Sequence, residues 1–209
     1  PLFEAHATIG STNQRLGELA EAGADPFTVV VANQQTAGRG RGGKPWVSTA
    51  GGLWVSILVP TSPGVFGRFV PLLAGLAVSR AVTHVSGVET RLKWPNDVLI
   101  GRKKLAGILC EAAPTGLVVT GIGINLRAPE SGWPTDLVET PCALVDHLEW
   151  PMAELRSALL SGVISELATL LRSTSIDDFK RMWSPLDALR GREVVCSMGP
   201  RGTASGIDD

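Results

Sequence analysis

Residues 104–126 read KLAGILCEAAPTGLVVTGIGINL, and this stretch decides the fold. Two apolar runs rich in β-formers, 104–111 and 117–126, flank the sequence Pro114-Thr115-Gly116. The pattern predicts a β-hairpin, because proline and glycine favour a tight turn between two paired strands. A central hairpin makes the two strands antiparallel neighbours, so we expect a mixed, mainly antiparallel sheet.

Apolar periodicity outside this hairpin predicts helices that flank the sheet. We expect further strands at 27–31, 53–59, 90–94 and 98–100. Helices are expected to start near Ser11 and end at Gly23, and to cover 66–85, 152–171 and 175–183. The chain is therefore expected to adopt an α+β fold, with the mixed sheet flanked by helices. Residues 192–209 predict two more strands around a Gly-Pro turn, which are too few to bury a core of their own.

Composition limits the class of protein. Of the 209 residues, 44% are hydrophobic and 19% are charged, as in globular rather than disordered chains. The net charge of −1 lacks the basic excess of proteins that bind nucleic-acid phosphates. We expect no membrane span and no signal peptide, since no apolar run looks long enough. Three scattered cysteines, Cys110, Cys142 and Cys196, favour a reducing, cytoplasmic location.

A glycine-arginine loop follows the strand expected at 27–31. Residues 38–46 read GRGRGGKPW and place Arg39, Arg41 and Lys44 among four glycines. Glycine lets the backbone approach a ligand closely, and arginine offers forked, permanently charged donors for carboxylates and phosphates. The loop therefore predicts an anion-binding site, although an isolated run of this kind is also typical of a solvated turn. GRGRGG also contains GxGxxG, but it lacks the strand-glycine-helix context of a dinucleotide site.

Four more motifs accompany the loop in a fixed order. GSTN (10–13) precedes QTAGRGRGGKPW (35–46), and KWPND (93–97), KKLAGI (103–108) and GIGIN (121–125) follow it. With these motifs the chain resembles the catalytic core of biotin protein ligase, and the resemblance is closest between 9 and 126. It implies a class II aminoacyl-tRNA synthetase/biotin ligase-like catalytic domain over 1–187. Residues 188–209 then resemble the start of a small C-terminal SH3-like β-barrel that is incomplete in this chain.

The resemblance also implies an activity and its partners. The expected enzyme activates biotin with ATP and Mg²⁺ to biotinyl-5′-AMP, then transfers biotin to one lysine of a biotin carboxyl carrier domain. That domain would belong to an acyl-CoA or pyruvate carboxylase. Little chain precedes Ile9, so we expect the enzyme-only type without a DNA-binding domain. We expect neither DNA nor membrane as a partner, and the protein could be a monomer or a homodimer.

Biotin-binding residues are carried over motif by motif. In KKLAGI, the family spacing selects Lys104 over Lys103 for the biotin carboxylate, and adjacent strand residues point to opposite faces. Ser11 also fits a helix N-cap, so capping and ligand contact both stay open for it. Gln35 matches the family better than Gln34. The full implied set is Ser11, Thr12, Asn13, Gln35, Gly38, Arg39, Gly40, Arg41, Lys104 and Gly107.

Nucleotide-binding residues come from the loop and from KWPND. The resemblance makes Arg39, Arg41 and Lys104 catalytic, with Arg41 holding the phosphate. Asp97 could bind Mg²⁺ or take a proton from the incoming lysine amine, and both roles stay open. The implied ATP and adenylate set is Arg41, Trp46, Lys93, Asn96, Asp97 and Asn125, in which Trp46 would stack on adenine.

Other classes fit the sequence less well. Lipoate and octanoate ligases share the adenylation chemistry, but their Arg-Arg-x-x-Gly-Gly-Gly loop is absent. A biotin-sensing repressor would need an N-terminal DNA-binding domain, and a P-loop protein would need GxxxxGK[ST]. One departure from the family is Cys142-Ala143-Leu144, which stands where Thr-Ser-Leu is usual.

Overall fold

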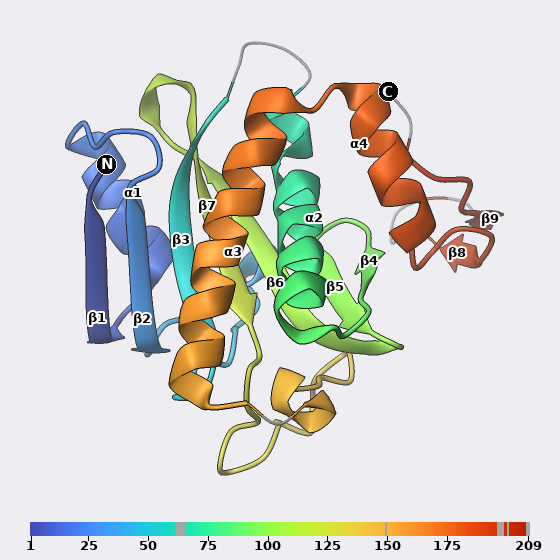
Figure 1. Cartoon of the computed structure of the whole chain (residues 1–209), viewed down its shortest axis with the longest axis horizontal. Coiled ribbons are helices and arrows are strands. Elements are labelled where there is room, and N and C mark those ends of the chain that lie inside the picture. The colour runs from blue at the N-terminus through green and yellow to red at the C-terminus, as the bar shows by residue number, and fades with distance from the viewer. Residues whose placement is uncertain (62–65, 149, 196–198, 200, 208–209) are drawn as a thin grey trace.

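A seven-stranded mixed sheet forms the centre of the protein, and two long helices cover one of its faces (Figure 1). The computed structural model of the chain describes residues 1–61, 66–148, 150–195, 199 and 201–207. Across the sheet, the strands described there follow the order β1 (Phe3–Ile9), β2 (Val29–Gln35), β3 (Leu53–Pro60), β7 (Leu117–Ile124), β6 (Lys103–Ala112), β5 (Asp97–Ile100) and β4 (Arg91–Lys93).

The predicted hairpin is confirmed and lies near the middle of this sheet. β6 and β7 pair antiparallel with Gly107 opposite Gly123, and a 3-10 turn at Pro114–Gly116 joins them. The other pairs are also antiparallel except β1 with β2, which is parallel. The expected mixed, mainly antiparallel sheet is therefore present.

Strand β1 is an addition that the sequence analysis missed. It lies at an edge of the sheet, and its half-buried side chains include the polar Glu4 and His6. Glu4 accepts two hydrogen bonds of 2.9 Å from Arg15 of α1 (Thr12–Glu21). Because ion pairing rather than apolar burial ties this strand to α1, it carries no core-facing apolar stripe that would have revealed it.

Alternation along the strands divides the interior into two cores. Val29 and Val31 of β2 face the larger core beneath α2 (Phe66–Ser86) and α3 (Met152–Ser173). Val30 points the other way, toward Leu16 of α1. Helix α3 presents an apolar stripe to the larger core at the three- and four-residue spacing of an amphipathic helix: Leu155, Leu159, Val163, Leu167 and Leu170.

Helix α4 closes one end of the larger core. It spans Ile176–Trp183 and begins with a capping box between Ser175 and Asp178. Its buried Phe179 ring lies 5.8 Å from the ring of Phe69 in α2 and 5.6 Å from Trp183, measured between centroids. The predicted helix near 175–183 is therefore confirmed, and its aromatic side chains fasten it to α2.

The expectation that no apolar run is long enough to cross a membrane was wrong. Within the described residues, Phe69–Ser86 of α2 reaches the length and the mean hydropathy, 1.4, of a membrane-crossing helix. In the fold, 67% of this stretch is buried inside the protein. Its hydrophobicity is explained by its position between the sheet and α3, where both sides of the helix contact apolar side chains.

The C-terminal part forms a small separate sheet. Strands β8 (Glu193–Val195) and β9 (Arg201–Thr203) pair antiparallel, so the expected two strands are present. The described residues do not form an SH3-like barrel. That residues 188–209 begin such a barrel stays a prediction. Cys196 and the proline of the expected Gly-Pro turn lie outside the described residues. Ala188 donates a hydrogen bond of 2.8 Å to the carbonyl of Leu92, which connects this part to β4.

Replacement of a core leucine on α2 should destabilise the fold strongly. Leu73 is completely buried between the sheet and α3, so Leu73→Ala leaves a cavity and should lower the free energy of unfolding by about 2–5 kcal/mol. Leu2→Ala is the control, since Leu2 is 49% exposed, and should change it by less than about 1 kcal/mol. Urea titration followed by circular dichroism measures both. Equal losses in the two variants would contradict the assignment of this core.

Candidate functional site

The candidate site lies on the face of the sheet opposite α2 and α3, where β6 and β7 carry glycines. Gly107 and Gly123 are paired across the two strands, and Gly121 lies two residues before Gly123. A Cβ atom on Gly123 would lie 2.5 Å from Nε1 of Trp46, and one on Gly121 would lie 2.1 Å from Oδ1 of Asn13. No real Cβ tolerates such distances, so glycine is what lets these two side chains reach the sheet.

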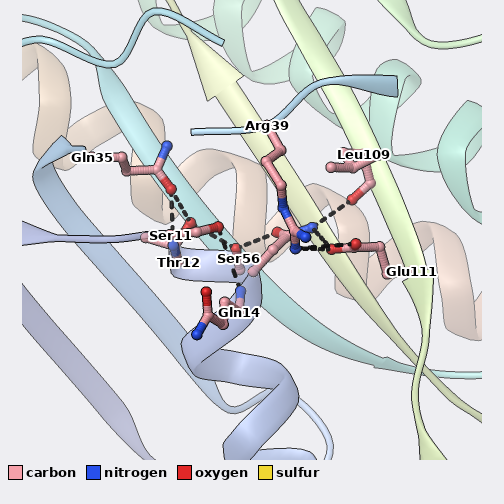
Figure 2. A network of polar contacts seen from close by, with 9 residues as sticks. Ser11, Thr12, Gln14, Gln35, Arg39, Ser56, Leu109 and Glu111 are labelled. Carbon is pink, nitrogen blue, oxygen red and sulfur yellow. Dashed lines mark hydrogen bonds and ion pairs between the residues drawn. The ribbon is translucent and has the colours of Figure 1, made fainter. Parts of the chain in front are cut away.

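We call the bare backbone of Gly107, Gly121 and Gly123 the glycine floor. The start of α1 supplies a network of uncharged polar groups beside it (Figure 2). Oε1 of Gln35 accepts hydrogen bonds from the amide and the hydroxyl of Thr12, at 2.8 and 3.0 Å. The buried Ser56 hydroxyl lies 2.8 Å from Oγ1 of Thr12 and 2.6 Å from Oδ1 of Asn13. The network joins α1, β2 and β3, so these groups hold fixed positions at the edge of the floor.

The polar residues of the network differ in whether they keep a hydrogen-bond donor for a ligand. Asn13 uses both amide hydrogens within the protein, toward the Leu109 carbonyl at 3.2 Å and toward Glu111 at 2.7 Å. Gln35 donates one amide hydrogen to Ser48 at 2.8 Å, and its second amide hydrogen is not donated to any residue in the described part of the chain. Ser11 caps α1 by accepting from the amide of Gln14 at 3.4 Å, and its own hydroxyl hydrogen is not donated to any described residue.

The predicted polar residues therefore fall into two groups. Ser11 and Gln35 line the pocket with unused donors, so capping and ligand contact are compatible for Ser11. Asn13 also lines the pocket, but its amide is committed to the protein. A direct bond from its amide hydrogens to a ligand would require one of these contacts to break.

The glycine-arginine loop folds back on itself. Gly40 donates a hydrogen bond of 2.7 Å to the carbonyl of Lys44, and Arg39 forms a β-bridge with Pro45. Gly38 must be glycine because a Cβ would lie 2.5 Å from Oγ of Ser48. Of the three loop cations, the structure brings only Arg39 to the pocket lining, and its guanidinium donates to Glu111 at 3.2 Å.

Arg41 occupies a different position from Arg39. It begins a short 3-10 turn, Arg41–Gly43, in which Gly42 has a φ of 70°. Its side chain is exposed and contacts no other described residue through a hydrogen bond or ion pair. The predicted phosphate contact of Arg41 therefore stays a prediction.

Trp46 lies on the glycine floor itself. A Cβ on Gly107 would be 3.0 Å from Cζ3 of its ring, and Nζ of Lys104 lies 5.2 Å from the ring centroid. The indole Nε1 is buried and donates no hydrogen bond to any residue that the structure describes. A buried donor without a partner is costly, so this nitrogen is available to a bound ligand or becomes exposed when the ring moves.

A group of four charged side chains, the charged cluster, lies where β4, β5 and β6 meet. Nζ of Lys104 is 2.7 Å from Oδ1 of Asp97, and Lys93 forms an ion pair with Glu139. Lys103, the neighbour of Lys104, is exposed. The structure thus brings Lys104 and not Lys103 to the pocket, as strand alternation predicts.

The two carboxyl groups of the charged cluster have shifted pKa values. Burial raises the pKa of Asp97 to about 6, although the Lys104 ammonium acts in the opposite direction. Burial also pushes the pKa of Glu139 upward, but hydrogen bonds from Lys93 and with Asp97 outweigh it, so this pKa lies below its usual value. Asp97 therefore holds a proton more tightly than an ordinary aspartate.

The two asparagines predicted for the nucleotide site differ in location. Asn96 lines the pocket and donates a hydrogen bond of 3.0 Å to the carbonyl of Ile108. Asn125 is buried outside the pocket lining, and its amide donates to the carbonyl of Lys104 at 3.4 Å. Its observed contact supports the strand that carries Lys104, and its nucleotide contact stays a prediction.

Sequence reasoning missed Ser56, Glu111 and Glu139. Ser56 had a visible signal as the lone polar residue of an otherwise apolar strand, and Glu111 had one as the single acidic residue of β6. Glu139 had none, since it belongs to an irregular segment that reaches the site only through backbone pairing. In that pairing the Lys104 amide donates to the Thr140 carbonyl at 2.8 Å, and the Lys104 carbonyl accepts from Cys142 at 3.0 Å.

Two cavities adjoin the loop. The pocket on the glycine floor has a volume of about 50 Å³, and a second cavity of about 430 Å³ lies along residues 34–38 and 45–49. The residues that line both are Gln35 and Trp46. Drug-sized ligands need pockets of roughly 300–1,000 Å³, so the floor pocket must enlarge before it holds such a ligand.

Comparison with known proteins identifies the family. The profile of the Biotin/lipoate A/B protein ligase family matches residues 6–127. The biotin–[acetyl-CoA-carboxylase] ligase of Mycobacterium tuberculosis is 44% identical over 218 residues, which cover 97% of this chain and 79% of that protein. The bifunctional ligase/repressor BirA of Bacillus subtilis is 38% identical over 145 residues, but this match covers only 45% of that longer protein.

A solved structure agrees with these relatives. The biotin protein ligase from Aquifex aeolicus, in complex with biotin and ATP, matches with a TM-score of 0.83 and 29% sequence identity. The match covers 99% of this chain and 88% of that chain. Both the sequence and the fold lead to one conclusion: the chain belongs to the biotin/lipoate A/B protein ligase family.

Proposed function

We propose that this protein is a biotin protein ligase. It would activate biotin with ATP to biotinyl-5′-AMP and then transfer biotin to a lysine of a biotin carboxyl carrier domain. The names of the M. tuberculosis relative and the A. aeolicus complex support this choice of substrate. The resemblance of the loop and of KKLAGI to the biotin ligase motifs supports it independently.

One observation about the pocket carries the proposal. The pocket lining combines Ser11 and Gln35, which hold donors that no described residue uses, with the ammonium of Lys104 and bare glycine backbone. A neutral ring carbonyl suits uncharged donors, while a carboxylate suits a lysine. Biotin carries a cyclic urea at one end and a carboxylate at the other, so its polarity matches the pocket.

The first step joins two anions. A carboxylate oxygen of biotin would attack the α-phosphorus of ATP, a new O–P bond would form, and pyrophosphate would leave with the electrons of the broken P–O bond. Fixed cations must offset the growing negative charge, which makes electrostatic stabilisation the main task of the enzyme. Lys104, which lines the pocket, would take this role, and Arg41 would join it when the loop moves toward the phosphate.

The second step releases the activated acyl group. The neutral amine of the carrier lysine would attack the acyl carbon, forming the amide while AMP leaves and the amine loses a proton. Asp97 suits the acceptor of this proton, because burial raises its pKa to about 6, nearer to neutral pH than an ordinary aspartate. Its ion pair with Lys104 holds the carboxylate at the edge of the pocket.

Residues of the charged cluster also fit a magnesium ion that accompanies ATP. Oδ1 of Asp97 is buried, and its partner among the described residues is the Lys104 ammonium at 2.7 Å. Carboxylate oxygen is the ligand that Mg²⁺ prefers, so Asp97 would hold it, with Glu139 beside it. The bound ion would offset phosphate charge.

Substrate binding should displace Trp46 from the glycine floor. The floor pocket of about 50 Å³ is too small for biotin, whereas the larger cavity shares Trp46 as a wall. Movement of the ring would expose the bare backbone of Gly107 and Gly123 to the ligand. The displaced indole would then be available to stack on adenine, as the resemblance implies.

Incubation with substrates tests the proposed function directly. The protein should release pyrophosphate from Mg·ATP when biotin is present, and a carrier domain should gain the mass of one biotin on a single lysine. Lipoate is the competing substrate, because the family profile covers both kinds of ligase. Pyrophosphate release with lipoate but not with biotin would overturn the proposal in favour of a lipoate ligase.

Lys104 and Lys103 form a matched pair of variants. Lys104→Ala removes the ammonium and should slow adenylate formation about 10²- to 10³-fold, as for other groups that stabilise developing charge. Lys103→Ala should change the rate by less than about twofold, because its side chain is exposed. Pyrophosphate release at saturating biotin measures both rates. Similar rates in the two variants would remove Lys104 from the reaction.

Stability should depend on pH through Asp97. Its pKa is about 6 when folded and 3.8 ordinarily, so the folded protein binds the proton more tightly. The free energy of unfolding contributed by this group therefore falls as pH rises from about 4 to 6. Asp97→Asn removes this fall, so the variant should gain roughly 1–3 kcal/mol relative to the parent between pH 4 and 7.

Urea titrations of both proteins in metal-free buffer measure this gain. Glu139 titrates in both proteins, and its lowered pKa acts in the opposite direction, so the comparison uses the difference between the two. A difference that stays constant across the pH range would show that Asp97 has an ordinary pKa.

A further inference from the structure

Glu111 lies outside the charged cluster and contacts two of the predicted biotin-binding residues, Asn13 and Arg39. It lies on β6, four residues after Gly107. Its carboxylate accepts from Nδ2 of Asn13 at 2.7 Å and from the guanidinium of Arg39 at 3.2 and 3.4 Å (Figure 2). These partners come from α1 and from the loop, so one side chain connects three segments of the site.

We propose that Glu111 is a positioning residue of this site, which holds the Arg39 guanidinium at the pocket and fixes the Asn13 amide before a ligand arrives. This inference rests on the proposed function for its ligand, biotin. Glu111 touches no reacting atom in the proposal and acts through its two partners.

The contact to Arg39 explains why this loop cation alone reaches the pocket. Arg39 and Arg41 are two residues apart on the same glycine-rich loop, yet among the described residues only Arg39 lines the pocket and has a carboxylate partner. Both side chains of this ion pair are partly exposed, at 48% for Arg39 and 39% for Glu111, so the guanidinium keeps donors that face solvent or ligand.

The contact to Asn13 completes the hydrogen bonding of a buried amide. Oδ1 of Asn13 lies 2.6 Å from the Ser56 hydroxyl, and its two amide hydrogens go to Leu109 and Glu111. This arrangement fixes which side of the amide faces the floor at Gly121. Removal of the carboxylate would leave one buried donor without its partner, a cost that favours reorientation of Asn13.

Biotin affinity measured by calorimetry provides the first test. Glu111→Gln keeps the shape and can still accept from Asn13, but it loses the ion pair with Arg39, so the Kd of biotin should rise about 3- to 10-fold. Glu111→Ala loses both contacts and should have the larger effect. Glu166→Gln is the control: it removes the 3.0 Å ion pair with Arg80 on the helical side and should leave the Kd unchanged.

A double-mutant cycle separates positioning from a general effect on the fold. In an Arg39→Ala background, Glu111→Gln should change the Kd of biotin by less than about twofold, because the partner it holds is already gone. An equal fold-change in both backgrounds would overturn the proposal, as would an unchanged Kd in Glu111→Ala. Urea midpoints of all variants confirm that each remains folded.

Trypsin provides a readout that does not depend on the identity of the ligand. In the ligand-free protein, Glu111→Ala should accelerate cleavage after Arg39 and Arg41 several-fold relative to wild type and to Glu166→Gln. Unchanged cleavage would overturn the proposal. If wild type does not bind biotin, the proposed function fails, while this experiment still decides whether Glu111 holds the loop.

Discussion

The close approach of side chains to bare backbone on β6 and β7 is the constraint on which the site depends. Trp46 and Asn13 occupy space that a single methyl group on Gly123 or Gly121 would fill. Because these strands also pair with each other at the centre of the sheet, the floor is held by backbone hydrogen bonds and not by the loop above it. The loop therefore lies over a floor that strand pairing holds in place.

Charges around this floor are arranged in pairs. Lys104 is held by Asp97, Lys93 by Glu139 and Arg39 by Glu111, so each of these cations has a carboxylate partner before substrate binds. Pairing lowers the cost of keeping half-buried cations in place, and it sets the positions from which they meet an anionic ligand. Arg41 lacks such a partner among the described residues and also lies outside the pocket lining.

Much of this arrangement could be predicted from the sequence, and the failures have physical causes. The hairpin around Pro114–Gly116 follows from turn chemistry, which acts over neighbouring residues. Lys104 was selected by the resemblance of KKLAGI, and strand alternation explains why Lys103 points away. Strand β1 was missed because it is tied to α1 through charge, between Glu4 and Arg15. Glu139 could not be found, because its approach to Lys93 depends on a backbone pairing between distant segments. The roles of the predicted site residues remain predictions, although most of them line one pocket.

Strand β7 serves the core and the site with alternate residues. Ile122 and Ile124 enter the core beneath the helices, while Gly121 and Gly123 form part of the floor. An insertion or deletion of one residue within the strand would exchange these two sets, placing isoleucines beneath Trp46 and glycines in the core. The length of β7 between its turn and Asn125 is thus constrained both by the core and by the site. Natural variation in length among related chains should accumulate instead in the turn at Pro114–Gly116, which neither constraint reaches.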